Sequence, residues 1–157
     1  MVPHELIAAL AQAGLSVPVD RSGLDEVPDA PGAYAVVLHL RQPVPLGLNA
    51  VSASSAPAGW HVYLGSARGP GGLRARLARH LRPNKKRHWH IDRLTLEADA
   101  ILVSAVREGS ECSLVDRLSE VPDLACLLPG FGSSDCRSCR GHLLSFQPDQ
   151  ASKNTVS

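Results

Sequence analysis

Residues 60–80 read Trp60-His-Val-Tyr-Leu-Gly-Ser-Ala-Arg-Gly-Pro-Gly-Gly-Leu-Arg-Ala-Arg-Leu-Ala-Arg-His80, and three patterns follow one another there without a gap. Val62 and Leu64 are apolar, β-prone residues and predict a strand that Gly65 ends. The loop 69–72, Gly-Pro-Gly-Gly, would fit no helix or strand interior. Beyond it, leucine recurs at every fourth residue over 73–81, which predicts an amphipathic helix.

The helix predicted over 73–81 is strongly basic. Arg76 and His80 are four residues apart, so both side chains lie on one face at the edge of the leucine stripe. Nine of the sixteen Lys and Arg residues fall between Arg68 and Arg93, where Asp92 is the only acid, although the net charge of the chain is +1. Such a cluster indicates a surface for phosphate groups, and the plainer alternative is a solvated helix face.

The composition is that of one globular domain. With 157 residues, 44% of them hydrophobic, the chain can bury a core of its own. No apolar stretch approaches the ~20 residues of a membrane span, and the start of the chain has no secretory signal pattern. We therefore expect a cytoplasmic protein that does not bind membranes. In that compartment the four cysteines stay reduced, which favours metal binding or burial over disulfides.

The first part of the chain predicts one helix and one strand. Residues 6–13 have helix-forming composition and end at Gly14, and a proline-broken acidic connection runs over 18–31. Residues 32–40 predict a strand with Tyr34, Val36, Leu38 and Leu40 on one face. The connection 41–59 is too long for a tight hairpin and contains no helical pattern, so we expect an exposed loop between two antiparallel neighbouring strands.

The segments after the basic helix complete an α+β domain. They predict a short helix within 88–96, a strand over 99–106, a helix over 111–118 with Ser110 as its cap, and a short strand near 143–146. The expected fold is a small antiparallel three-stranded β-sheet flanked by helices. We divide the chain into an N-terminal helical extension (1–29), the domain with a cysteine-rich C-terminal segment (30–147) and a disordered tail (148–157).

Four short motifs occur in a fixed order along the chain: Gly32-Ala-Tyr34, Tyr63-Leu-Gly65, Leu73-x-x-Arg76-x-x-x-His80 and a helix that opens with Glu111. Together they resemble the signatures of the GIY-YIG nuclease superfamily. Each motif alone carries little information, whereas the ordered set is fairly specific. The resemblance covers about residues 30–146 and implies a GIY-YIG-like fold.

The nearest resemblance is to the Uri-type branch of that superfamily, the domain once called DUF123. That branch adds a Trp-His-Ile-Asp segment, Glu-Cys, and Gly-Phe-Gly-Ser-Ser-Asp-Cys, which are present here as 89–92, 111–112 and 130–136. Two departures stand out. The two tyrosine motifs are separated by the long 41–59 connection, and Ser66 occupies a position where many members have lysine.

The resemblance implies a DNA endonuclease whose catalytic residues are Tyr34, Tyr63, Arg76, His80 and Glu111, with Mg²⁺ (or Mn²⁺) on Glu111. Phosphodiester hydrolysis independently requires a group that orients water, positive charge on the phosphate and stabilisation of the leaving alkoxide. Either tyrosine could handle the water, Arg76 the phosphate and Glu111 the metal, with His80 relaying protons. A phenol with a pKa near ~10 is a poor base, so a nearby cation would have to favour the phenolate.

A second metal site is compatible with the cysteine spacing. Cys136, Cys139 and His142 are spaced as zinc ligands, and Cys112 or Cys126 could supply the fourth. The second paired half of a firm zinc signature is missing, so burial of the cysteines is the favoured alternative.

The main alternative to an enzyme is a non-catalytic nucleic-acid-binding module that uses the basic helix and carries a structural zinc. A nucleotide-binding phosphate loop is excluded because the 69–72 loop lacks the Gly-Lys-Ser/Thr ending, so no small-molecule cofactor is expected. The DNA preference and the oligomeric state do not follow from the sequence. Under either interpretation the expected contacts to flanking phosphates come from basic residues: Arg74, Arg79, Arg82, Lys85, Lys86 and Arg87.

Overall fold

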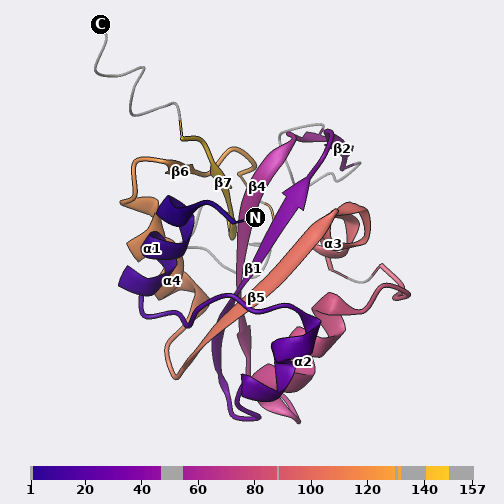
Figure 1. Cartoon of the computed structure of the whole chain (residues 1–157), viewed down its shortest axis with the longest axis vertical. Helices are drawn as coiled ribbons and strands as arrows, with labels where there is room; N and C mark the ends of the chain where they lie inside the picture. The colour runs from indigo at the N-terminus through magenta and orange to yellow at the C-terminus, as the bar shows by residue number, and fades with distance from the viewer. Residues whose placement is uncertain (1, 47–54, 88, 130, 132–140, 149–157) are drawn as a thin grey trace, which may run out of the picture.

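The protein folds around one antiparallel sheet of five strands, in the order β5-β1-β4-β7-β6 (Figure 1). The computed structural model describes residues 2–46, 55–87, 89–129, 131 and 141–148. The α+β class is confirmed. The sheet has two strands more than the three expected, because the C-terminal segment pairs with it. The strands are β1 (Gly32–Leu40), β4 (Gly59–Ala67), β5 (Ala100–Arg107), β6 (Leu124–Ala125) and β7 (Leu143–Phe146).

Strand β1 lies at the centre of the first three strands. It pairs antiparallel with β4 along its whole length, with Tyr34 opposite Gly65 and Val36 opposite Tyr63, and with β5 on its other side. The antiparallel pairing expected across the long connection is therefore confirmed. Strand β4 continues to Ala67, two residues past the predicted end at Gly65, because its ladder with β1 continues as far as Gly32.

Each face of the sheet is covered by two helices, the first and last of the described α-helices on one face and two consecutive α-helices on the other (Figure 1). Helices α1 (His4–Gln12) and α4 (Glu111–Ser119) pack on one face through Leu6, Leu10 and Leu114. Helices α2 (Gly72–Leu81) and α3 (Asp92–Glu97) pack on the other through Leu73, Leu77 and Leu94. Ser110 caps α4, as predicted, by accepting a hydrogen bond from the Ser113 N–H.

The start of α2 is held by the segment before β1. Gly71 and Gly72 have φ values of 81° and 59°, and a side chain on Gly72 would meet the Ala30 carbonyl at about 2.5 Å. In the first turn of α2, the N–H groups of Leu73 and Arg74 donate to the carbonyls of Ala30 and Pro28, and that of Gly72 donates to the Gly69 carbonyl. These donors are therefore satisfied within the protein and do not face a ligand.

Short elements complete the fold. A 3-10 helix (η1, Arg21–Glu26) precedes β1, and Val19 pairs with Val103 of edge strand β5. The 41–59 connection begins and ends in a two-residue ladder of β2 (Val44–Pro45) and β3 (Ser55–Ala56), and positions 47–54 lie outside the described residues, as do 149–157 of the predicted tail. Among the helices that the structure describes, none is long and apolar enough to cross a bilayer.

Candidate active site

Tyr34 is one of the two fully enclosed residues of the predicted catalytic set, with 2% of its surface exposed. Its side chain leaves β1 near the start of the strand and crosses directly over Gly65 of β4. A Cβ atom at position 65 would lie 2.4 Å from the Tyr34 hydroxyl, so only glycine fits under the ring. The tyrosine of the first motif and the glycine of the second therefore form one packing unit.

His80 lies over the same face of the sheet and joins the two tyrosines. The Tyr34 hydroxyl and His80 Nε2 are 2.8 Å apart, at hydrogen-bond distance. The His80 ring also packs at 6.1 Å from the Tyr63 ring and at 5.6 Å from the Trp89 ring, centroid to centroid. His80 Nδ1 is buried and has no hydrogen-bond partner among the described residues.

Burial keeps these groups uncharged at neutral pH. It raises the pKa of Tyr63 to about 12 and raises the pKa of Tyr34 still further, and in both cases the lowering effect of Arg76 is smaller than the effect of burial. Burial, reinforced by the charge of Lys85, lowers the pKa of His80 to about 3. Arg76 alone therefore does not favour a phenolate, since desolvation is the larger effect.

Arg76 and Arg79, both half-buried, are stacked on one indole ring. The guanidinium carbon of Arg76 lies 4.7 Å from the Trp89 ring centroid, and that of Arg79 lies 4.0 Å from it. Arg79 also forms a bidentate pair with Asp92, at 3.1 and 2.9 Å, and Asp92 accepts the Trp89 N–H at 2.9 Å. Asp92 is fully buried and therefore fixes both the arginine and the indole beside His80.

Glu111, the predicted metal ligand, begins α4 and is partly exposed beside the end of β4. The Ser66 hydroxyl donates to the Glu111 carboxylate and accepts the Glu111 N–H at 3.2 Å. The Glu111 charge raises the pKa of both tyrosines, which places the carboxylate in the same electrostatic environment. Ser66 thus orients the carboxylate and supplies no charge.

The residues predicted to contact flanking phosphates divide into two groups. Arg74 donates to the carbonyls of Val27 and Asp25, Arg79 is paired with Asp92, and Lys85 donates to the carbonyl of His80. These three cations hold the fold together around α2, and burial lowers the pKa of Lys85 to about 8. The remaining three are exposed on the loop after α2: Arg82, Lys86 and Arg87.

The predicted zinc site is described only in part. Cys136 and Cys139 lie outside the described residues. His142 is buried, its N–H donates to the Phe131 carbonyl, and its Nε2 has no partner within the described part of the chain. Cys112 is partly exposed in the first turn of α4. The described ranges contain no group of three His, Cys, Asp or Glu side chains that could hold a metal ion.

Three residues of this cluster had no role assigned from sequence: Ser66, Trp89 and Asp92. The Trp-His-Ile-Asp segment was a usable signal for the contact between Trp89 and Asp92. An aspartate carboxylate can accept the backbone N–H of the residue three positions before it and so close a turn, as Asp92 does with the Trp89 N–H. The contact between Ser66 and Glu111 joins residues 45 apart, and no local pattern marks it.

The fold and this cluster define a small α+β domain with tyrosine, histidine and arginine side chains gathered on one face of its sheet. A family model described as "Domain of unknown function DUF123" matches residues 33–157, and the chain belongs to that family. No match was found among curated proteins or among solved structures.

Proposed function

We propose that the protein is a metal-dependent endonuclease of the GIY-YIG type that hydrolyses phosphodiester bonds in DNA. The observation that supports this most strongly is the gathering of four side chains from three separate elements on the α2 face of the sheet, with a carboxylate from a fourth element close enough to raise the pKa of both tyrosines. Strands β1 and β4 supply the tyrosines, helix α2 the arginine and histidine, and α4 the carboxylate: Tyr34, Tyr63, Arg76, His80 and Glu111.

Arg76 is the group best suited to the phosphate. It is partly exposed, its guanidinium is fixed over Trp89, and it lines a small cavity of about 130 Å³ at the start of α2. A guanidinium can donate two parallel hydrogen bonds to phosphate oxygens and stabilise the charge that develops on them. Arg79 lines the same cavity but is neutralised by Asp92, so Arg76 carries the charge that faces a substrate.

The uncharged Tyr34 and His80 pair can move a proton without forming a phenolate first. Unprotonated His80 can accept the Tyr34 proton at Nε2, across the 2.8 Å contact, as the Tyr34 oxygen accepts a proton from the attacking water. A raised tyrosine pKa and a lowered histidine pKa keep the resting pair in this neutral form. In this scheme Tyr34 handles the water, and Tyr63 packs against His80 and orients it.

Glu111 is the residue that would hold a divalent cation. A single carboxylate suits Mg²⁺, which retains several waters and takes substrate phosphate as a ligand. The Glu111 carboxylate is partly exposed and fixed by Ser66, which fits this requirement. When bound there, the cation would stabilise negative charge on the leaving oxygen. Mn²⁺ has the same preference for oxygen ligands.

The proposal is tested by incubating the protein with supercoiled plasmid and Mg²⁺ or Mn²⁺. Nicked or linear product is expected from the wild type and none from Glu111→Gln, because the amide is a weaker ligand for a cation. Glu120→Gln, an exposed position that follows α4, is the matched control and should cleave normally. DNA binding without cleavage by the wild type under both metals would instead support the non-catalytic binding module.

A further inference from the structure

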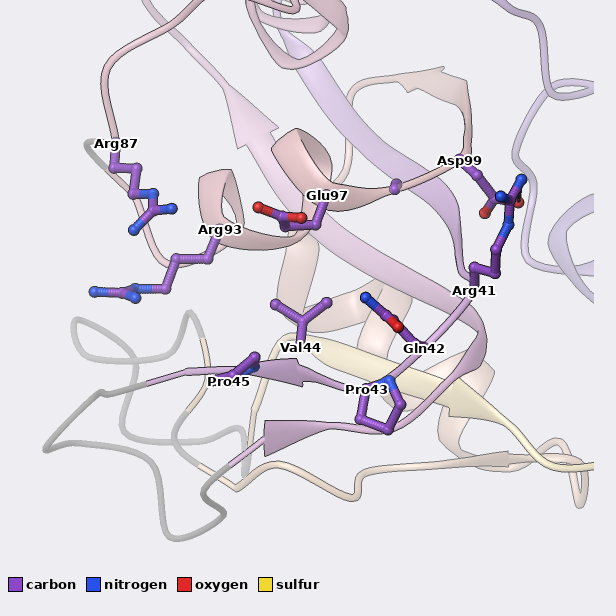
Figure 2. Close-up of a pocket in the computed structure, with 10 residues that line it drawn as sticks. Arg41, Gln42, Pro43, Val44, Pro45, Arg87, Arg93, Glu97 and Asp99 are labelled. Atoms are coloured by element: carbon purple, nitrogen blue, oxygen red, sulfur yellow. Dashed lines mark ion pairs between the residues drawn. The ribbon is translucent and has the colours of Figure 1, made fainter.

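A second hollow, of about 740 Å³, lies between α3 and the chain around β2 (Figure 2). None of the five predicted catalytic residues lines it. Its volume is in the range of about 300–1,000 Å³ that is usual for small-ligand sites. The side chains that matter for its chemistry are Arg41, Gln42, Val44, Arg87, Arg93 and Glu97.

The two ends of this hollow differ in charge. Figure 2 shows Arg87 and Arg93 extending toward one end, and Arg41 beside Asp99 at the other. Arg41 lies 3.7 Å from Asp99, whose carboxylate also contacts His39 at 2.8 Å. Neither the Arg87 side chain nor the Arg93 side chain has a hydrogen-bond or ion-pair partner in the described part of the chain. Uncompensated positive charge is therefore concentrated at the Arg87 and Arg93 end.

The surface between these ends is apolar with two polar groups above it. Pro43, Val44 and Pro45 form one wall as the chain passes from β1 into β2. Their side chains are aliphatic and offer apolar contacts for a base, and Figure 2 shows Val44 pointing into the hollow toward Glu97. Gln42 and Glu97 add an amide and a carboxylate that can accept hydrogen bonds from amino groups.

We infer that this hollow binds one nucleotide unit of a nucleic-acid strand, with the phosphate on Arg87 and Arg93 and the base against Pro43 and Val44. The inference deepens the proposed function and rests on it in taking the strand to be the substrate. The start of α3 contributes to both sites. Asp92 holds Arg79 beside Arg76 in the candidate active site, and Arg93, which follows Asp92 in the chain, lines the hollow. A strand held at Arg76 can thus continue into the hollow.

This occupant implies a substrate with an unpaired nucleotide near the cut. The base must expose its face to the Pro43 and Val44 wall, and in a duplex both faces are stacked. An acidic peptide would also suit the two arginines, but its carboxylates would be repelled by Glu97 and Asp99, whereas the amino groups of bases are attracted by them.

The site is tested by titrating ¹⁵N-labelled protein with dCMP in EDTA, where no metal-dependent cleavage occurs. Saturable shifts are expected at the amides of Gln42, Val44 and Ala98, which line the hollow. Ribose 5-phosphate, which lacks the base, should bind about fivefold or more weakly, since stacking on one base contributes on the order of 1–3 kcal/mol. Shifts confined to α2 and Trp89, or no shifts, would overturn the inference.

The strand itself is tested with a fluorescent single-stranded oligodeoxynucleotide, also in EDTA. Arg93→Gln should weaken binding several-fold and reduce the salt slope by about 0.7, the value for one phosphate contact on a single strand. Arg21→Gln, an exposed arginine on η1, is the matched control and should bind as the wild type does. Equal affinities of the two variants, or equal competition by a poly-glutamate peptide, would refute the nucleotide site.

Because these measurements need no cleavage, they separate this inference from the proposed function. A protein that binds dCMP in the hollow but never cuts DNA would retain the nucleotide site and lose the endonuclease proposal. A protein that cuts DNA but shows no shifts at Val44 would retain the endonuclease and lose the nucleotide site.

Discussion

The two faces of the sheet are built from different chemistry. On the α1 and α4 face, the buried hydrophobic residues of the core are all Ala, Val or Leu, and the buried Ser104, opposite Ala35, donates a hydrogen bond to the Ser16 carbonyl. On the α2 and α3 face, a core of similar size encloses Tyr34 and lies against fully buried His80 and Asp92. Burying polar groups costs free energy unless each finds a partner, and aliphatic packing would be at least as stable. The difference teaches that the second face is shaped by something besides stability.

The largest expected effect follows from removing the buried carboxylate of the polar face. Asp92→Ala leaves the Arg79 guanidinium without its bidentate partner and should lower the free energy of unfolding by about 3–5 kcal/mol, the range for a broken buried ion pair. Urea unfolding measures this. Asp116→Ala, at an exposed position of α4, should change it by less than about 0.5 kcal/mol. Equal effects of the two substitutions would mean that the Asp92 pair contributes nothing to the polar face.

On the aliphatic face, a substitution should affect stability alone. Leu10→Ala removes a fully buried side chain and should cost about 2–5 kcal/mol of unfolding free energy. The rate of DNA cleavage per folded molecule should stay within about twofold of the wild type, as measured well below the unfolding transition. A large loss of cleavage in folded Leu10→Ala would break the comparison between the faces.

On the polar face, a substitution at the partly exposed Arg76 should affect catalysis and leave stability nearly unchanged. Arg76→Ala should slow the cleavage step about a hundredfold or more at saturating enzyme, equivalent to about 2.7 kcal/mol, with little change in DNA affinity. Arg82→Ala, exposed just after α2, should do the reverse and reduce the salt slope by about one unit. Normal cleavage by saturated Arg76→Ala would leave α2 as a docking surface only.

The last expected effect concerns pH and is spread over several pH units. Because the pKa of His80 falls from its ordinary value to about 3 in the folded protein, the unfolded chain binds the extra proton between about pH 3 and 6.5. Stability should therefore rise with pH in that window, by at most about 1.4 kcal/mol per pH unit, and be fully present above it. Comparing unfolding of the wild type and His80→Gln between pH 4 and 7 tests this. The variant should show a shallower slope, and parallel slopes would show that His80 is not held uncharged.

Much of the fold could be predicted because local patterns determine it. The strand over 32–40 was predicted with its observed bounds, since Pro31 precedes it and its residues suit a buried central strand. Helix α3 lies within the segment predicted over 88–96 except that it extends one residue further, to Glu97, and it is shorter than that segment. It begins at Asp92, whose carboxylate accepts the Trp89 N–H and holds the preceding residues in a turn.

The site could be predicted as a set of residues but not as an arrangement. The ordered motifs predicted the tyrosines and Glu111 as candidates, whereas the pairing of Arg79 with Asp92 depends on how the intervening loop folds back. Arg79 was for that reason assigned to DNA phosphates, although it is half-buried against Trp89. The protonation of the phenols also escaped prediction, because alternation along a strand does not fix how deeply a side chain is buried.

The position of β7 has a consequence for how the chain reaches its native state. This strand, the last in sequence among those described, lies between β4 and β6, and the Leu64 N–H donates to the His142 carbonyl just before it. Until β7 docks, β4 presents an unpaired edge around Val62, and β6 has no neighbour. A ribosome-bound chain that stops short of residue 143 therefore exposes the central sheet to association with other chains, and the closing step joins segments about 80 residues apart.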